Sequence, residues 1–329
     1  MATYKGIQGY SVQKLSDDPT ASESVGQLFY NSTAGKFKIA IQGAGTWASA
    51  NNCNTGRAGK GAAGSQTANL IFGGDTDPAA YQPYTESYDG TTWTEVNNLL
   101  TGRRNMGTGL GSQTAALCVA GYTDSPATQV DIVESYNGTS WTEVNDVQTT
   151  RSSLGSAGTT TAAICFGGSP DRADTETFDG TSWTSVNNMN EGRSSGAAFG
   201  IQTAAIYAGG ETPQTDDVEQ WDGTSWTEVA DMNTNAQRRG GAGTVTDGLA
   251  IGGTIDPPVT VNTEAWDGTS WTEVNNLAQA GYGRSAGGTG STGSSSIAVS
   301  GLYVPPPDRL LTTEEWTSPV YTIKTVTVS

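Results

Sequence analysis

The sequence predicts an all-β protein in which most of the 329 residues form a ring of small four-stranded sheets. The main observation is a repeat with a period of about 45 residues, which marks a stack of one supersecondary unit. Five copies end in nearly the same phrase, which reads Tyr88-Asp-Gly-Thr-Thr-Trp93-Thr-Glu-Val96 in the first copy and recurs around Trp141, Trp183, Trp226 and Trp271. The 44 glycines suit many tight turns and no long helices.

The first two strands of each unit are predicted from small and apolar residues. An arginine opens each unit, and these arginines are Arg57, Arg103, Arg151, Arg193, Arg238 and Arg284. A strand of small residues follows, and then an apolar strand that ends in Gly-Gly or a close variant, as in Leu70-Ile-Phe-Gly-Gly74. A continuous apolar run of this length indicates a strand that is covered on both faces. The glycines indicate crowded backbone where no side chain fits.

The third and fourth strands are predicted from a Glu-x-aromatic pair and the phrase that follows it. The pairs are Glu86 and Tyr88, Glu134 and Tyr136, Glu176 and Phe178, Glu219 and Trp221, Glu264 and Trp266, and Glu314 and Trp316. The next residues are Asp-Gly or Asn-Gly, which favour a tight hairpin because both tolerate positive φ. The fourth strand alternates through Trp, Thr, Glu and Val, so we expect it to be half-buried at an edge, with the Trp ring against a neighbouring sheet.

The number of strands predicts how the ring closes. Six copies contain the first three strands, but only five contain the full fourth strand after them. The segment Gly45-Thr-Trp47 matches the fourth-strand pattern and precedes Trp93 by 46 residues. We therefore expect this segment to complete the sheet that holds Trp316, which gives a six-bladed β-propeller over residues 45–316. Such closure removes exposed sheet edges.

The order of these residues resembles the kelch repeat of kelch and galactose-oxidase-like β-propellers. The resemblance rests on the arginine, the apolar strand with Gly-Gly, the Glu-x-aromatic-Asp-Gly turn and the Trp, and it covers residues 45–316. The copper-oxidase chemistry of that family uses histidine, which this chain lacks. The hairpin phrase at Ser87–Trp93 also resembles the Asp-box of six-bladed sialidases, although one residue between Asp and Gly is missing. That box braces a hairpin away from the active site, so the likeness implies a turn and not catalysis.

The recurring charged residues and the cysteines are predicted to be structural. One arginine and one glutamate per unit suggest Arg–Glu pairs that fix the loops. Arginine triads bind carboxylates in sialidases, but recurrence in all six units favours the structural interpretation. Cys118 and Cys165 occupy equivalent places in apolar strands and are expected to be buried small side chains. Cys53 lies in a polar segment, and three cysteines give no disulfide framework.

The two ends of the chain fall outside the repeat. Residues 1–44 include Gln27–Ala40, which predicts a β-hairpin around an Asn-Ser-Thr-Ala-Gly turn. The phrase from Gly26 to Lys38 resembles the start of virion structural proteins of marine bacteriophages, particularly tail-associated ones. The resemblance implies that this segment docks to other virion proteins and that virion symmetry sets the oligomeric state. Residues 317–329 predict one further strand, which pairs with the hairpin or forms a local clasp.

Candidate binding residues come from the loops between the second and third strands, which differ between copies. These loops and the loops that join successive units emerge on the same face of such a ring, and loops on a rigid scaffold commonly carry binding sites. The candidates are Asp75, Asp77, Tyr81, Tyr84, Tyr122, Asp124, Asp171, Arg172, Asp216, Asp217, Asp256, Tyr303, Asp308 and Arg309. Aromatic rings beside polar groups suit sugars, whereas the alternative is a set of solvated connectors without a ligand.

The sequence contains no pattern that predicts a cofactor, a metal or a catalytic residue. Asp75 with Asp77, and Asp216 with Asp217, could offer oxygen ligands to calcium, but they lack the spacing of an EF-hand loop and are better explained as exposed charge. Histidine, the commonest general base and metal ligand, is absent. The formal charge of −17 disfavours nucleic acid and anionic membrane surfaces as partners.

These observations predict a non-enzymatic virion structural protein, tail-associated or surface-exposed, that is made in the host cytoplasm. No apolar leader or membrane-spanning run is present in the sequence. The variable loops would bind a host-surface glycan or another virion protein. Two alternatives remain at this stage, a glycan hydrolase on a sialidase-like propeller and a cytoplasmic kelch adaptor for a protein partner.

Overall fold

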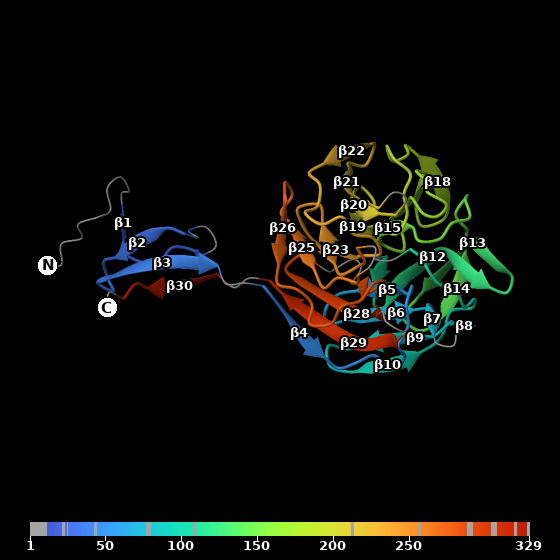
Figure 1. The fold of residues 1–329 in the computed structure, drawn as a ribbon, viewed down its shortest axis with the longest axis horizontal. Helices are drawn as coiled ribbons and strands as arrows, with labels where there is room; N and C mark the ends of the chain where they lie inside the picture. Colours follow the sequence, from blue (N-terminus) through green and yellow to red (C-terminus); the bar gives the residue numbers. More distant parts are fainter. Residues whose placement is uncertain are drawn as a thin grey trace. The chain divides into compact units, whose positions relative to one another are not determined.

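The computed structural model describes residues 12–21, 24, 26–42, 45–76, 80–107, 110–211, 214–255, 258–287, 292–303, 308–318 and 321–327. These residues form β-strands and no α-helix (Figure 1). Two compact units are present, one formed by Thr46–Thr317 and the other by Met1–Gly45 with Ser318–Ser329. Within the described ranges, no helix has the length and hydropathy that a membrane span requires.

The larger unit contains six four-stranded antiparallel sheets, which we call sheets one to six in chain order. Sheet one consists of β5 (Gly61–Gly64), β6 (Asn69–Phe72), β9 (Thr85–Tyr88) and β10 (Trp93–Val96). Sheet two consists of β11 (Gly111–Ser112), β12 (Ala115–Asp124), β13 (Ala127–Tyr136) and β14 (Trp141–Val144). Sheet three consists of β15 (Gly155–Gly158), β16 (Ala163–Phe166), β17 (Thr175–Phe178) and β18 (Trp183–Val186).

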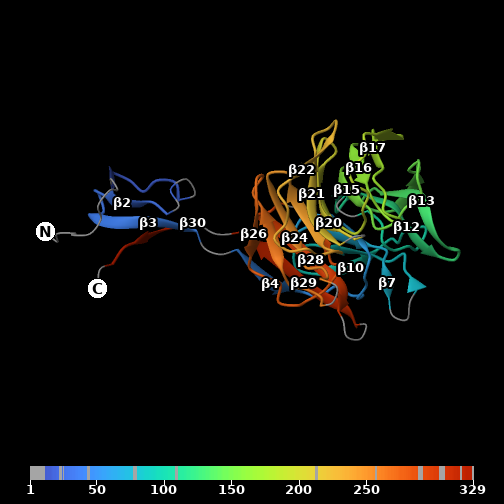
Figure 2. The same ribbon diagram turned by 45° about the horizontal axis from the view of Figure 1, so that its top comes forward.

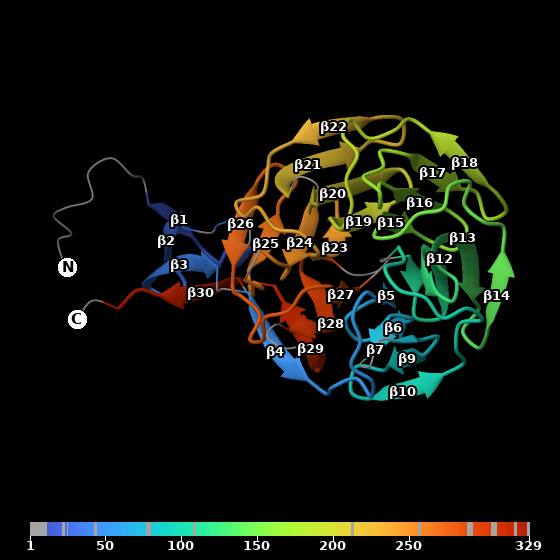
Figure 3. The same ribbon diagram turned by 45° about the vertical axis from the view of Figure 1, so that its right-hand side comes forward.

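Sheets four to six follow the same plan. Sheet four consists of β19 (Ala197–Ile201), β20 (Ala204–Gly210), β21 (Thr215–Trp221) and β22 (Trp226–Val229). Sheet five consists of β23 (Gly240–Thr244), β24 (Asp247–Ile251), β25 (Thr263–Trp266) and β26 (Trp271–Val274). Sheet six consists of β27 (Ser285–Ala286), β28 (Ser295–Tyr303), β29 (Asp308–Thr317) and β4 (Thr46–Ala50). The sheets surround a common axis, with the first strand of each innermost (Figure 3).

Sheet six joins the start of the larger unit to its end. Strand β4 pairs antiparallel with β29, with Trp47 opposite Trp316 and Thr46 opposite Thr317. The two tryptophan rings lie 5.4 Å apart between centroids. The strand pairing predicted from the Gly45-Thr-Trp47 segment is therefore present.

Small residues in the innermost strands allow close packing around the axis. All four residues of β5 are buried, and a Cβ added to Gly61 would lie 2.1 Å from the ring of Phe72. The Gly-Gly pairs after the second strands have left-handed backbones, with φ of 64° at Gly73 and 97° at Gly74. A Cβ at Gly73 would lie 2.7 Å from the carbonyl oxygen of Arg103, so a larger residue there would require the surrounding backbone to shift.

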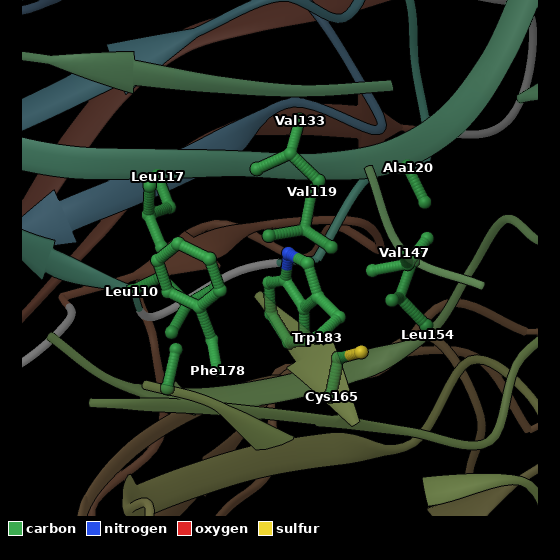
Figure 4. Packing of buried hydrophobic residues seen from close by; sticks show 11 residues of the cluster. Leu110, Leu117, Val119, Ala120, Val133, Val147, Leu154, Cys165, Phe178 and Trp183 are labelled. Carbon is green, nitrogen blue, oxygen red and sulfur yellow. The ribbon is translucent and has the colours of Figure 1, made fainter. Parts of the chain in front are cut away.

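The hydrophobic core lies between neighbouring sheets, as Figure 4 shows for sheets two and three. Trp183 and Phe178 of sheet three pack with Leu117, Val119 and Val133 of sheet two. The fourth-strand tryptophan therefore belongs to the packing between sheets, which agrees with its recurrence in the sequence.

A hydrogen bond accompanies this packing wherever the neighbouring sheet has a threonine before its glutamate. The indole Nε1–H donates to Thr Oγ1 in the pairs Trp47–Thr263 (3.1 Å), Trp93–Thr313 (3.2 Å), Trp141–Thr85 (3.1 Å) and Trp226–Thr175 (3.0 Å). Sheets two and four have Val133 and Val218 at this position. The buried indole N–H groups of Trp183 and Trp271, which face these sheets, have no acceptor among the described residues.

Six buried ion pairs brace the sheets, one in each. The pairs are Arg57–Glu86, Arg103–Glu134, Arg151–Glu176, Arg193–Glu219, Arg239–Glu264 and Arg284–Glu314. Each glutamate also holds the loop that enters its sheet. Glu134, for example, accepts hydrogen bonds from the backbone N–H of Leu100 at 2.7 Å and of Thr101 at 3.2 Å. The structural interpretation of the arginine–glutamate rows agrees with this geometry.

The assignment of Arg238 to this row was wrong. Its neighbour Arg239 pairs with Glu264, at 2.8 Å. Sheets one to four place the bracing arginine two residues before a residue with a left-handed backbone, whereas sheets five and six place it one residue after. The guanidinium reaches the same glutamate from both positions, so the spacing in the sequence could not identify the residue.

The smaller unit contains one sheet in the order β1 (Gln13–Leu15), β2 (Leu28–Asn31), β3 (Lys36–Gln42) and β30 (Tyr321–Thr325). Strands β2 and β3 form the expected hairpin, with Tyr30 opposite Phe37. Strand β30 pairs antiparallel with β3, so residues from both ends of the chain form one sheet. Phe29 and Ala40 are buried in this unit.

Two further features differ from a uniform repeat. Strands β12 and β13 of sheet two, like β28 and β29 of sheet six, have nine or ten residues, whereas the other second and third strands have four to seven. Strands β12 and β13 form a projecting hairpin (Figure 2). Cys53, expected in a polar segment, is buried, and its thiol donates to the carbonyl of Leu311 at 3.3 Å. Burial raises the pKa of the Cys53 thiol and raises the pKa of both Cys118 and Cys165 to about 12.

Candidate binding pocket on the ring axis

A circle of left-handed residues surrounds the axis just before the innermost strands. Its members are Gly59, Asn105, Ser153, Ser195, Arg238 and Gly283, with φ between 54° and 61°. The backbone N–H of each of the last five donates to the carbonyl of the member before it, at 2.6, 2.6, 2.8, 2.7 and 3.0 Å. We call this set the axial circle. It holds one residue from every sheet at a fixed place around the axis.

The axial circle lines a pocket of about 310 Å³. Asp75 and Glu211, which follow second strands, also contribute, as do Leu302 near the end of β28 and Arg309 near the start of β29. The pocket therefore opens on the face whose loops differ between copies. A pocket of this size is at the lower end of those that hold small molecules.

Asp75 and two arginines form one side of the pocket. The Asp75 carboxylate lies 2.5 Å from Nη2 of Arg309 and 3.5 Å from Nη1 of Arg104. The Arg104 guanidinium also lies over the ring of Tyr81, 4.6 Å from its centroid, and Tyr81 contacts Tyr122 edge-on with centroids 6.1 Å apart. These contacts leave the Arg104 side chain 35% exposed, so part of its guanidinium is open to the pocket.

Arg238 forms the opposite side of the pocket. Its Nε donates to Oε1 of Glu211 at 2.7 Å, and its guanidinium lies 5.4 Å from the ring centroid of Tyr282. The side chain remains 45% exposed. Arg238 is the one long side chain in the axial circle, where the other members are Gly, Asn and Ser.

Buried cations line the pocket more deeply. Lys60 follows Gly59 and is 2% exposed, and burial is the main reason that its pKa falls to about 7, with Arg57 and Arg284 lowering it further. Arg239 and Arg284 line the same pocket. Nη2 of Arg239 and Nε of Arg284 have no hydrogen-bond acceptor among the described residues.

The distribution of charge separates this pocket from the rest of the propeller. Residues 46–317 contain 11 Lys and Arg and 30 Asp and Glu, which gives a formal charge of −19. Six of the 11 are the bracing arginines, and four more line the pocket, namely Lys60, Arg104, Arg238 and Arg309. The remaining one, Arg172, pairs with Asp174 at 3.0 Å. Against these four cations, the described residues of the pocket lining include two carboxylates, Asp75 and Glu211.

The structure brings together some of the residues predicted from the loops. Asp75 and Arg309 line the pocket, and Tyr81 and Tyr122 lie behind Arg104. Arg172 lies outside the pocket lining, while Asp171 is exposed in its loop with φ of 42°.

Five other predicted residues, Tyr84, Asp124, Asp216, Asp217 and Tyr303, are not among those that line the pocket. Tyr84 is 42% exposed, Asp124 ends β12 in an exposed position and Tyr303 ends β28. Asp216 and Asp217 lie on β21 beside Asp231, whose pKa is raised by burial and then by these two charges. Asp308 begins β29. Asp77 and Asp256 are outside the described residues.

Sequence reasoning missed five of the pocket residues, Lys60, Arg104, Arg238, Glu211 and Tyr282. All of them except Glu211 belong to the axial circle or are adjacent to one of its members. The sequence pattern in these segments predicted only a bracing arginine. A comparison of equivalent positions in the six copies could have identified Lys60. The residues that follow the members of the axial circle are Lys60, Met106, Leu154, Gly196, Arg239 and Arg284, and Lys60 is the one lysine among them. No group of three or more Cys, Asp or Glu in the described part of the chain could hold a metal ion.

The all-β sheets and their arrangement define the class of this protein as a β-propeller. Among the solved structures that the chain resembles is that of YjhT, with a TM-score of 0.67 and 12% sequence identity over 83% of this chain and 99% of that one. A likeness at this identity shows the fold alone. No protein-family model and no curated protein matches the chain.

Proposed function

We propose that this protein is a non-enzymatic virion component of a bacteriophage, tail-associated or surface-exposed, whose complete six-bladed ring presents a binding face. The observation that carries the binding role is the pocket of about 310 Å³ on the face with divergent loops, lined by residues from every sheet. The closure of sheet six by β4 supports a rigid ring. Rigid positioning favours binding because less conformational freedom is lost when a ligand docks.

The virion role is motivated by the opening segment, whose phrase from Gly26 to Lys38 resembles phage virion proteins. The hairpin of β2 and β3 in the smaller unit is the segment that we propose docks to other virion proteins. The binding face of the propeller would then meet a host-surface glycan or a further virion protein.

Two measurements test this proposal. Mass spectrometry of purified particles is expected to detect the protein, and its absence from particles would contradict the virion role. Binding of the intact protein to host-surface glycan is expected to require the pocket face. Asp174→Asn, which removes a carboxylate outside the pocket, is the matched control and is expected to leave binding unchanged.

A glycan hydrolase is the second candidate, because the pocket brings Tyr282 and Glu211 to the same arginine. Arg238 contacts the ring of Tyr282 and the carboxylate of Glu211, and sialidases are the glycoside hydrolases that use a tyrosine as nucleophile. Release of reducing sugar from host polysaccharide, lost in Tyr282→Phe, would favour this candidate over the binding role.

A further inference from the structure

The Lys and Arg residues of the propeller that do not belong to the six bracing pairs are concentrated at one place. All of them except Arg172 line the axial pocket, although the propeller as a whole has a formal charge of −19. Chance placement on a surface this acidic does not explain the grouping. A cleft lined by one sign of charge attracts the opposite charge over a short range.

The ion pairs inside the pocket do not use all of its positive charge. Asp75 is shared by Arg104 and Arg309, and Glu211 is paired with Arg238. These contacts match two carboxylates to three arginines, and Lys60 lies beside them in the lining. Among the lining residues that the structure describes, these three arginines therefore exceed the two carboxylates by one positive charge.

Spare hydrogen-bond donors point to the same chemistry. Arg239 and Arg284 are 5% and 2% exposed, and each has an N–H without an acceptor among the described residues. Arg57, Arg151 and Arg193 also have such an N–H, but only Arg239 and Arg284 of these five line the pocket. A buried donor without an acceptor is costly, so native proteins usually supply one from a ligand or a water molecule. Oxygen atoms of an anion accept from guanidinium groups in strong charge-assisted hydrogen bonds.

We propose that the axial pocket binds the acidic group of a sugar, a carboxylate or a sulfate, through Lys60, Arg104, Arg238 and the spare donors of Arg239 and Arg284. This inference rests on the proposed glycan-binding role and names the class of glycan. The acidic outer surface repels extended polyanions, so the pocket selects one small acidic group and not a nucleic acid.

Lys60 makes the proposed binding depend on pH. Its pKa in the free protein is about 7 because of burial, and an anion beside the ammonium favours the charged form. The contribution of Lys60 to anion affinity is therefore complete below pH 7 and is lost as pH rises above 7 through the pKa of the complex. Affinity at pH 6 is expected to exceed affinity at pH 9.

The chain supplies its own substitutions for the test. Arg238→Gly copies Gly59 and Gly283 of the axial circle and relieves a left-handed backbone at a non-glycine residue, so this variant is expected to fold. Lys60→Met copies Met106, which is buried at the equivalent place in sheet two. Arg172→Gln removes a cation outside the pocket and serves as the control.

The experiment is calorimetric titration of the full chain with methyl glucuronide, methyl galacturonide and galactose 6-sulfate, each beside its neutral parent sugar. We expect at least one acidic sugar to bind at least tenfold more tightly than its parent. Arg238→Gly is expected to weaken that binding about tenfold or more, as loss of a charge-assisted contact would. Lys60→Met is expected to weaken it at pH 6 and to remove most of the pH dependence.

The outcomes separate the inference from the proposed function. Equal binding of acidic and neutral sugars, unchanged in Arg238→Gly, would overturn the anion site but leave the glycan-binding role standing. Binding of no sugar in the panel would overturn the anion site, and the particle analysis would then decide the virion role separately. A loss in Arg172→Gln as large as in Arg238→Gly would also overturn the site, because it would show a general charge effect.

Discussion

Val133→Thr is expected to stabilise the protein, although a hydroxyl introduced into a core ordinarily destabilises one. Val133 is fully buried and packs with Trp183, whose indole N–H has no acceptor among the described residues. A threonine at the equivalent position of sheet three accepts from the indole of Trp226 at 3.0 Å. The substitution therefore supplies the missing acceptor without changing the shape of the side chain.

The magnitude follows from two opposing terms. A buried N–H left without a partner costs about 1–3 kcal/mol, and a new hydroxyl buried without a partner costs about 1–3 kcal/mol by protein mutational data. In Val133→Thr each group becomes the partner of the other, so both penalties are avoided. We expect a gain of about 1 kcal/mol in the free energy of unfolding, which is the usual net value of a hydrogen bond.

Urea denaturation followed by tryptophan fluorescence measures this change as a shift in the midpoint at constant slope. Thr175→Val is the reverse substitution and is expected to destabilise by about 1–3 kcal/mol, because it leaves Trp226 without an acceptor. Val299→Thr places a hydroxyl in a core cluster where Trp93 already has its acceptor. Destabilisation by Val133→Thr as large as that by Val299→Thr would refute the reasoning.

Three further predictions concern the charged and turn residues. Glu134→Gln leaves Arg103 buried without its carboxylate, so a loss of about 3–5 kcal/mol in urea denaturation is expected, whereas exposed Asp174→Asn is expected to cost less than about 1 kcal/mol. Burial lowers the pKa of Lys60 to about 7, so unfolding takes up a proton between pH 7 and the ordinary pKa of lysine, and the free energy of unfolding rises with pH in that window. Lys60→Met should remove this rise. The same dependence of the free energy of unfolding on pH in Lys60→Met would contradict the burial of Lys60. Asn137 accepts two backbone N–H bonds at 2.9 Å where the other hairpins have aspartate, so Asn137→Asp is expected to raise the thermal midpoint through a gain of about 0.5 kcal/mol, and a lower midpoint would contradict it.

Most of the sheet architecture could be predicted from the sequence because each residue type that recurs in the repeat has one structural role. The Asp-Gly turn, the Trp of the fourth strand and the bracing glutamate each follow from local chemistry and recur at a fixed spacing. The pairing of Trp47 with Trp316 followed from counting strands. Long-range closure was thus predictable from a local pattern.

The pocket could be predicted only in part because its residues are exceptions to the repeat. Asp75 and Arg309 were found because they lie in loops that differ between copies. Arg238 was assigned to the bracing row because bracing arginines occur at two different spacings from the left-handed residue, so spacing did not show that Arg239 is the one that pairs with Glu264. Lys60 carried no sign of burial in the sequence, because burial there depends on packing from other sheets.

The pairing of Thr46 with Thr317 has a consequence for how the chain could be rearranged. Directly opposed residues of antiparallel strands have Cα atoms about 5 Å apart, so the chain enters and leaves the ring at one spot. Strands β3 and β30, which flank the ring in the sequence, are likewise paired with each other. The ring is therefore inserted in the sequence between two strands, β3 and β30, that are hydrogen-bonded to each other. A different domain whose ends are equally close could replace the ring and preserve the pairing of β3 with β30.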